Sequence, residues 1–340
     1  MDTLTHALSG ALLARATAPK DAPPQSLPRR VAAGFLACAS PDLDVVVGAF
    51  GPVAFIENHR GVTHSFVLLP LWALLYSFLL AKILREPLGA RALYAVTAMS
   101  LALHIAGDVI TTYGTMILAP FSDWRAQIGT TFIIDPWFSG IIVAGLAASW
   151  VLRRLGRWPA VAACAVLAGY VGFQYLQKEK AIAFGERYAS EHAITGARIN
   201  VQPRPVSPFN WTVFVSDAEW HYFANVNLIR QVPRPALEDD GFIARLDSAY
   251  LPLGQARWQK RARFGDGPDA AVARDAWNSP ALAAFRWFAQ IPAFDGFESG
   301  SACVRFIDLR YVVPGRSTLP FRFGACRDAP GAPWRMVRPG

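Results

Sequence analysis

The chain has 340 residues, of which 53% are hydrophobic and only 17% are charged, and its mean hydropathy is +0.25. Soluble domains usually carry about 25% charged residues. The composition excludes a disordered chain, a coiled coil and a disulfide-dense secreted scaffold, and it disfavours a purely soluble protein. The net charge is +8, but the basic residues form no stripe interleaved with aromatic side chains. No nucleic acid is therefore expected as a partner.

Two short apolar stretches open the chain. Residues 3–16 contain Arg15, and residues 31–50 are interrupted by Pro41-Asp42-Leu43-Asp44. We expect an N-terminal pair of short or re-entrant helices, which are tolerated only when they are packed inside protein. No basic segment precedes the first apolar stretch, so we expect no cleaved signal peptide.

Longer uncharged runs follow. A transmembrane helix needs about 20 mostly apolar residues. The runs 61–81 and 158–177 meet this length, 136–152 is near the lower limit, and 92–107 reaches it if the helix continues to about residue 112. We predict four spans in a mostly α multi-pass membrane bundle. A large soluble helical core is the alternative, although such cores rarely contain so many long uncharged runs.

Basic residues predict the orientation of the spans. They cluster between the apolar runs, around 15–30, 82–91 and 153–157. The positive-inside rule places such loops in the cytoplasm, and everything after residue 177 then lies outside it. We predict a membrane helical bundle over 1–177 and a small extracytoplasmic domain over 178–340.

Short β-like runs separated by turns characterise the second half of the chain. Examples are 211–215, 220–224 and 304–308, and helical character returns near 269–290. This pattern predicts an α+β domain with an antiparallel sheet.

Two cysteines test the predicted compartment. Cys303 and Cys326 are symmetric about a predicted hairpin centred on Pro314-Gly315, so they could face each other across two strands. A disulfide there would suit an oxidising compartment outside the cytoplasm. Two unpaired thiols are the alternative.

Ionisable groups in the apolar half are the candidate functional residues, because such groups are costly inside a membrane. They fall at the same end of the predicted bundle, opposite the basic loops. Imidazole and carboxylate ligands suit Zn²⁺, Mn²⁺ or Fe²⁺. The set exceeds what one tetrahedral site needs, so one or two ions are expected. The predicted metal ligands are His6, Asp42, Asp44, His59, His64, His104 and Asp108.

The spacing of these residues suggests individual roles. His104 and Asp108 are four positions apart, so on a helix they share one face and can reach one ion. Asp108 or Asp44 could instead be a catalytic base or the partner of a ligand histidine. Arg60 could hold a phosphate or carboxylate bidentately. Each motif also has a structural interpretation, such as a helix cap or a buried hydrogen-bonded pair.

Other polar residues are expected to be structural. Thr63 and Ser65 would cap the following helix. Cys38 would be a small core residue. His192 and His221 lie in the polar half and are expected to be ordinary domain or surface residues.

Four motifs carry the predicted ligands. They are MDTLTHALSG at the start, SPDLD at 40–44, HRGVTHS at 59–65 and LHIAGDVITTYG at 103–114. Together they resemble the YdjM/YfhP-type family of inner-membrane metal-dependent hydrolases, and HRGVTHS is the most specific of them. The segment PFNWTVFV at 208–215 resembles the longer members. The resemblance implies a multi-pass protein of the bacterial inner membrane, with the seven His and Asp residues as metal ligands.

These observations favour a membrane-embedded metal-dependent hydrolase. A metal-activated water would be the nucleophile, and the substrate would be a phosphoester, a membrane lipid or another amphiphile. A metal transporter or sensor, and a scaffold with a structural metal, remain alternatives. A transport path should extend polar groups across the bilayer, whereas the inner parts of 66–81 and 92–102 offer only hydroxyl groups.

Overall fold

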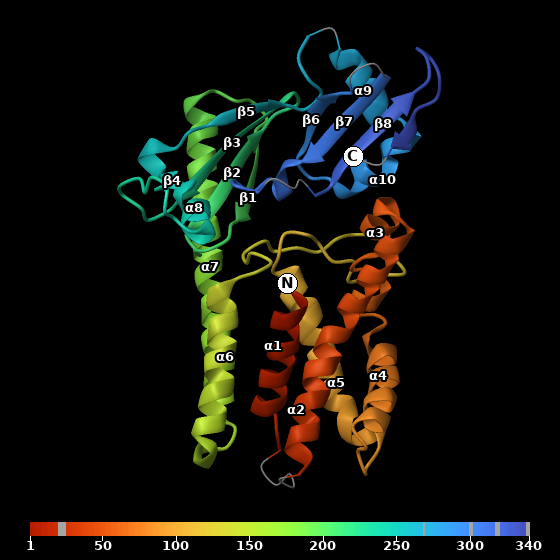
Figure 1. The fold of residues 1–340 in the computed structure, drawn as a ribbon, viewed down its shortest axis with the longest axis vertical. Helices are drawn as coiled ribbons and strands as arrows, with labels where there is room; N and C mark the ends of the chain where they lie inside the picture. Colours follow the sequence, from red (N-terminus) through yellow and green to blue (C-terminus); the bar gives the residue numbers. More distant parts are fainter. Residues whose placement is uncertain (20–24, 268, 299–301, 317–319, 338–340) are drawn as a thin grey trace. The chain divides into compact units, whose positions relative to one another are not determined.

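The computed structural model describes the whole chain except residues 20–24, 268, 299–301, 317–319 and 338–340. The chain forms two compact units, one of residues 1–49 with 58–176 and the other of 50–57 with 177–340. The first unit is helical, and the second contains two β-sheets with short helices (Figure 1). A helical part followed by a small β-rich domain agrees with the expected order.

Helices build the first unit, and a long non-helical segment over residues 110–135 joins α5 to α6. Asp2 caps the first of them by accepting a hydrogen bond from the backbone N–H of Thr5, and Asp135 caps α6 in the same way. Most of α3 and the end of α7 belong to the second unit. In chain order up to residue 191, the helical elements are α1 (Thr3–Ala16), α2 (Ser26–Ala39), η1 (Ser40–Phe50), α3 (Pro52–Asn58), η2 (Val62–His64), α4 (Leu69–Ile83), α5 (Ala90–Val109), α6 (Pro136–Val151), η3 (Arg153–Leu155) and α7 (Trp158–Glu191).

Three of the described helical segments are long and apolar enough to cross a membrane. They are Ser26–Phe50, Ala90–Val109 and Trp158–Glu191. The pair Pro52–His64 and Leu69–Ile83 passes the same test together but is bent by 80°. The described residues therefore supply three candidate spans, or four if the bent pair is one span.

The candidate spans differ from the predicted ones at three places. Residues 61–81 are not one helix, because η2 and a non-helical stretch precede α4, which starts at Leu69 with Pro70 in its first turn. The run 136–152 gives α6, whose 16 residues are short for a span. Residues 31–50, predicted to be interrupted, lie within a helical segment of 25 residues, because α2 passes directly into η1 at Ser40.

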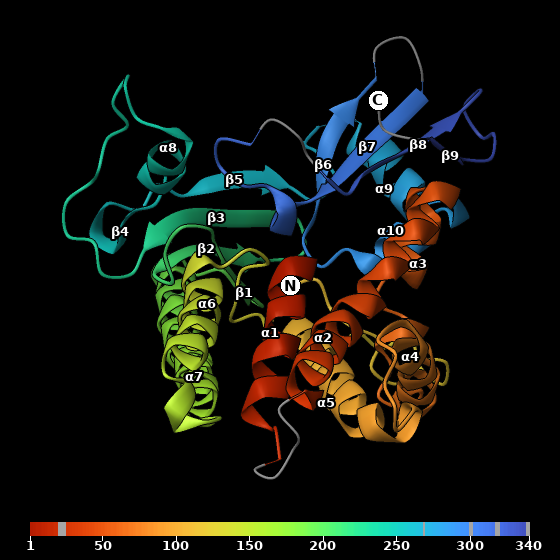
Figure 2. The ribbon, with the colours of Figure 1, turned by 60° about the horizontal axis from the view of Figure 1, so that its bottom comes forward.

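α1 and α2 lie side by side (Figure 2). They pack closely because glycine faces glycine where they meet. A Cβ atom on Gly34 would lie 2.5 Å from the carbonyl oxygen of Gly10, and one on Gly10 would lie 2.1 Å from that of Gly34. Small residues let membrane helices approach backbone to backbone. This contact brings His6 of α1 near Cys38 and the following η1.

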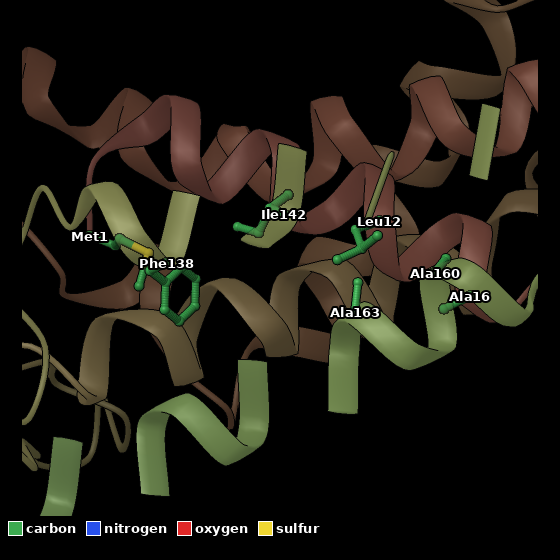
Figure 3. Packing of buried hydrophobic residues seen from close by; sticks show 7 residues of the cluster. All are labelled: Met1, Leu12, Ala16, Phe138, Ile142, Ala160 and Ala163. Carbon is green, nitrogen blue, oxygen red and sulfur yellow. The ribbon is translucent and has the colours of Figure 1, made fainter. Parts of the chain in front are cut away.

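Apolar side chains from α1, α6 and α7 share a buried core (Figure 3). Leu12 and Ile142 are fully buried there. Near this core, Tyr170 and Gln174 of α7 donate hydrogen bonds to the carboxylate of Asp135, which fixes α6 against α7. The core residues are Met1, Leu12, Ala16, Phe138, Ile142, Ala160 and Ala163.

Two sheets organise the second unit. The first has the strand order β1-β2-β3-β4 with β5 paired to β3, and the second has the order β6-β7-β8-β9. The predicted runs 211–215, 220–224 and 304–308 lie in β2, β3 and β7, and 269–290 gives the expected helices. The elements are β1 (Arg198–Pro203), β2 (Asn210–Ser216), β3 (Trp220–Asn227), α8 (Phe242–Ser248), β4 (Leu251–Pro252), η4 (Leu253–Gln255), β5 (Gln259–Ala262), α9 (Ala270–Asn278), η5 (Pro280–Leu282), α10 (Ala283–Phe288), β6 (Pro292–Phe297), β7 (Ala302–Asp308), η6 (Leu309–Tyr311), β8 (Arg322–Arg327) and β9 (Arg335–Val337).

Strand β2 of the first sheet is buried on both of its faces. Along β2, side chains alternate between the faces. Trp211 and Val213 pack with Ala181 of α7, whereas Phe214 packs with Ile307 of the second sheet. The second unit therefore has a layered core of helix, sheet and sheet.

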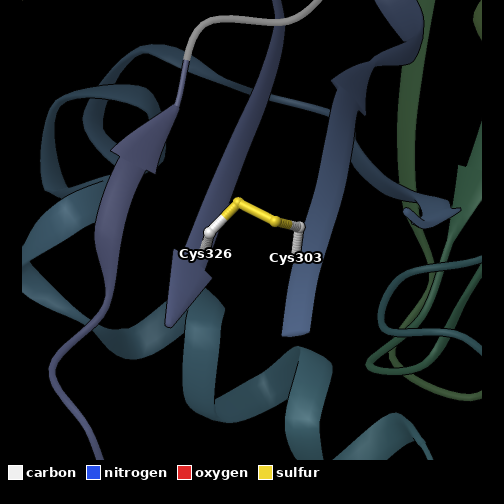
Figure 4. Close-up of a disulfide and its surroundings, with 2 residues drawn as sticks. All are labelled: Cys303 and Cys326. Atoms are coloured by element: carbon white, nitrogen blue, oxygen red, sulfur yellow. A yellow bond between two sulfur atoms is a disulfide. The ribbon is translucent and has the colours of Figure 1, made fainter. Parts of the chain in front are cut away.

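The predicted pairing of two cysteines is confirmed (Figure 4). Cys303 of β7 and Cys326 of β8 are direct partners in an antiparallel register and form a disulfide with their Cα atoms 4.0 Å apart. The connection between the strands contains η6 and is longer than a tight hairpin turn.

Candidate metal centre

The structure brings the predicted His and Asp side chains into one buried region of the first unit. They come from α1, η1, the segment 59–64 and α5, and all seven are buried. Four of them, His6, Asp42, His104 and Asp108, each offer one ligand atom, and these atoms lie within 4.8 Å of one another. We call these four residues the central group.

Asp108 is at the centre of this region. Its Oδ1 lies 3.0 Å from Nε2 of His6 and 2.8 Å from Nη2 of Arg60, and it also contacts the amino group of Met1. Its Oδ2 lies 3.1 Å from Nε2 of His64 and 3.4 Å from Nε2 of His104. One fully buried carboxylate thus faces three imidazole rings.

His64 links the central group to a second set of residues. Its Nε2 lies 2.9 Å from Nε2 of His104 and 3.8 Å from Oδ1 of Asp42. Its Nδ1 lies 3.3 Å from Oδ2 of Asp44 on the other side of the ring. The ring therefore has the central group at one nitrogen and Asp44 at the other.

Asp44 is surrounded by hydrogen-bond donors. Its Oδ1 lies 2.6 Å from Nδ1 of His59. Its Oδ2 accepts bonds from the backbone N–H of Arg60 at 3.0 Å and from the hydroxyl of Thr63 at 2.8 Å. Asp44 and His59, both predicted as ligands, thus form an outer pair beside the central group, with Asp44 also against His64.

The orientation of His104 is fixed by the backbone of α2. Nδ1 of His104 lies 2.6 Å from the carbonyl oxygen of Cys38 and donates to it, because a carbonyl can only accept. In the neutral ring, Nε2 then presents its lone pair to the central group. The ring of His6 stacks on it with centroids 3.7 Å apart. Gly107 leaves room for His6, since a Cβ there would lie 3.1 Å from Cε1 of that ring.

The conformation of Arg60 lets its backbone contact Asp44 and its side chain contact Asp108. Its φ is +62°, in the left-handed region that is rare for a residue with a side chain. This backbone directs its N–H to Asp44, while its guanidinium contacts Asp108, donates to the hydroxyl of Thr111 and lies over the ring of Tyr113. Arg60 faces the site, but its charge is engaged by a protein carboxylate.

The residues present fit a divalent cation. Oδ2 of Asp42 is buried and has no hydrogen-bond partner among the described residues. Oδ2 of Asp108 is buried too, and although it lies near Nε2 of His64 and of His104, neither contact has the geometry of a hydrogen bond. Buried carboxylate oxygens without a donor are costly, and coordination of a cation satisfies them. The imidazole nitrogens of His6, His64 and His104 complete a nitrogen and oxygen donor set that suits first-row metals.

Sequence reasoning missed several partners of these residues. The sulfur of Cys38, predicted as core, lies with His6 and His104 in a second potential ligand group. Thr63 bonds Asp44 and does not cap α4, and Thr111 bonds Arg60. Ser65 accepts bonds from the backbone N–H groups of Val67 and Leu68, but these residues form the turn before α4, so Ser65 does not cap that helix as predicted. The missed contacts depend on tertiary packing, and no motif spacing signals them.

The comparisons with known proteins agree with this architecture. The model of the YdjM inner membrane protein family matches residues 1–181, which is more than half of the chain and includes every residue of the site. The chain belongs to this family of membrane proteins. It is also 30% identical over 152 residues to YfhP of Bacillus subtilis (strain 168), an uncharacterized protein. That match covers 44% of this chain and 45% of YfhP, so the chain spans about half the length of this relative. No solved structure matches the chain.

Proposed function

We propose that this protein is a membrane-embedded, metal-dependent hydrolase that acts on a phosphoester or lipid-like substrate. One observation carries the proposal: histidines and aspartates from four separate segments converge in a buried cluster within an apolar helical unit. Burying so many ionisable groups is costly, and binding of a metal offsets this cost.

One or two divalent ions would be held in this cluster, with Zn²⁺ expected and Mn²⁺ or Fe²⁺ as alternatives. His6, His64 and His104 would bind through ring nitrogens, and Asp42 and Asp108 through carboxylate oxygens. When bound, the ion supplies a water of lowered pKa and stabilises negative charge that develops on the substrate.

The outer pair is proposed to handle the proton of the attacking water. Asp44 accepts the Nδ1 hydrogen of His59 and fixes that ring. A ring held in this way accepts a proton at Nε2 with its orientation already set, which is the arrangement of a carboxylate-assisted general base. Asp44 is then a positioning residue, whereas His59 is the catalytic one.

Arg60 is proposed to position and neutralise Asp108. Its guanidinium contacts that carboxylate at 2.8 Å and is almost fully buried. A second role, binding an anionic group of the substrate, would use its buried Nε, which has no hydrogen-bond partner among the described residues.

The membrane favours an amphiphilic substrate. The first unit contains candidate spans, so a lipid could reach the cluster from the bilayer without leaving an apolar environment. We propose a membrane lipid or another amphiphile with a hydrolysable phosphoester as the substrate class.

A direct test measures hydrolysis by the purified full chain. The protein in detergent would be loaded with Zn²⁺ or Mn²⁺ and assayed with bis(p-nitrophenyl) phosphate and with phospholipid vesicles. We expect turnover that is lost in His64→Ala and Asp108→Ala but kept in His192→Ala, whose ring is exposed on the second unit. Metal uptake into proteoliposomes without any hydrolysis would contradict the proposal and favour a transporter.

A further inference from the structure

A cavity in the second unit lies outside the part of the chain that the family model covers. It has a volume of about 500 Å³, within the range of small-molecule pockets. It lies between the two sheets, with walls from β2, β3, β5, β6 and β7. The metal cluster belongs to the first unit, so this cavity is a separate feature.

The chemistry of the walls divides into two parts. Next to the packed inter-sheet core, the cavity is lined by aromatic and aliphatic side chains. The neighbouring part of the wall is polar, because Thr212 and Asn225 of the lining are register partners across β2 and β3. Gln202, the register partner of Thr212 on β1, continues this polar row outside the lining. The apolar lining residues are Phe214, Phe223, Leu251, Phe294, Ile307, Leu309 and Val312.

A buried arginine, Arg204, contacts the polar row through the side chain of Thr212. Arg204 is 4% exposed, and it donates to the hydroxyl of Thr212 at 2.6 Å and to the backbone carbonyl of Arg310 at 2.9 Å. Its Nη2 has no hydrogen-bond partner and it forms no ion pair among the described residues. A buried guanidinium without a carboxylate leaves a positive potential at the polar end of the cavity.

Two arginines, Arg257 and Arg261, line the cavity itself and are exposed, which places them at its opening. Arg257 and Arg261 form no ion pair in the described part of the chain. The acidic side chain in the lining, Asp295, is already paired with Arg322. The polar side of the cavity therefore has an excess of positive charge, whereas its inner wall is apolar.

We propose that this cavity binds a single-chain amphiphile with an anionic headgroup. The apolar wall would take the hydrocarbon chain, and the guanidinium groups of Arg257 and Arg261 would bind the headgroup by charge-assisted hydrogen bonds. The field of Arg204 favours an anion over a neutral headgroup. The assignment does not depend on the proposed hydrolase activity.

The test uses the full chain in phosphatidylcholine nanodiscs and a long-chain fatty acid that carries a diazirine near its methyl end. After photolysis, mass spectrometry locates the labelled peptides. We expect labelling of β2, β3 and β7, and a decrease of about tenfold in the double variant Arg257→Glu/Arg261→Glu, which corresponds to loss of about 1.4 kcal/mol of binding. The control Arg335→Glu changes an exposed arginine on β9 and should label normally.

A cavity variant, competing ligands and chelator treatment distinguish between the possible results of the labelling experiment. Ala249→Phe places bulk in the cavity and should reduce labelling without reversing any charge. Equal labelling by the corresponding long-chain alcohol, or displacement by inorganic phosphate alone, would overturn the proposal, because the first shows no headgroup recognition and the second shows a site for small anions. Labelling confined to the helices of the first unit would also overturn it. Chelator treatment, which removes metal, should leave labelling unchanged.

Discussion

Nε2 of His64 lies 3.1 Å from Oδ2 of Asp108, and both side chains are fully buried. This contact joins the HRGVTHS motif to the C-terminal end of α5, one of the candidate spans. His64 also contacts His104 and Asp44, so it connects the central group with the outer pair. Variants of the central group and variants of the outer pair are therefore expected to behave differently.

Substitutions in the outer pair should separate catalysis from metal binding. We expect His59→Gln to keep bound metal but to lower hydrolysis by about 10²-fold or more, because a positioned general base contributes this much. Asp44→Asn should also keep bound metal and lower the rate of hydrolysis. Metal content and turnover, measured on the same preparations, test this. Loss of metal in His59→Gln would instead identify His59 as a ligand.

Close packing of α1 and α2 should be necessary for the site. Gly34→Ala would place a Cβ 2.5 Å from the carbonyl oxygen of Gly10, so the helices must separate and His6 must move away from Asp108. We expect lower thermal stability and at least partial loss of metal. The matched control is Gly169→Ala in α7, where a Cβ has no neighbour within 4 Å. Similar behaviour of the two variants would show that the crossing tolerates a side chain.

A buried histidine should make the second unit sensitive to acid. Nε2 of His221 donates to the carbonyl oxygen of Pro292, and burial lowers the pKa of His221 below its ordinary value. As pH falls below about 6.5, His221 is protonated in the unfolded chain but stays neutral in the folded chain, so the unfolded chain binds more protons than the folded one. The stability of the second unit should therefore decrease between pH 7 and pH 5.

The measurement is unfolding of the detergent-solubilised chain in urea at several pH values. Limited proteolysis reports the loss of structure in the second unit. His221→Gln should reduce the pH dependence by roughly 1 kcal/mol per pH unit, whereas His192→Gln, on an exposed side chain, should not. An unchanged slope in His221→Gln would assign the acid sensitivity to other groups.

The positive-inside pattern predicts that the second unit is outside the cytoplasm. Alkaline phosphatase, which is active only after export, should be active when fused at the C-terminus and inactive when fused after residue 88, in the basic loop. The disulfide between Cys303 and Cys326 is consistent with an oxidising compartment. The opposite pattern of phosphatase activity would reverse the orientation.

Some features of the molecule could be read from local sequence. The symmetric placement of Cys303 and Cys326 indicated the register of β7 and β8, because antiparallel partners are equidistant from the turn. The convergence of the ligands could be predicted because the topology placed four motifs at the same end of the bundle. An uncharged run, however, does not reveal where a helix bends, so the 80° break before α4 was not predictable.

Other features depend on tertiary contacts. The Gly10 and Gly34 contact, the bond from Thr63 to Asp44 and the burial of His221 join residues that no local pattern relates. The cavity between the sheets is lined by residues of several strands, and its polar row becomes apparent only when β1, β2 and β3 are in register. Sequence therefore indicated the chemistry of the site better than the packing around it.

Binding of metal by the buried His and Asp cluster is measured most directly as the metal content of the purified full chain, by inductively coupled plasma mass spectrometry. We predict about one or two divalent ions per chain in the wild type, with Zn²⁺ the expected ion. In His64→Ala and Asp108→Ala, the content should fall at least tenfold, while His192→Ala retains it and all variants elute as single species. Wild-type metal content in both His64→Ala and Asp108→Ala would contradict the account.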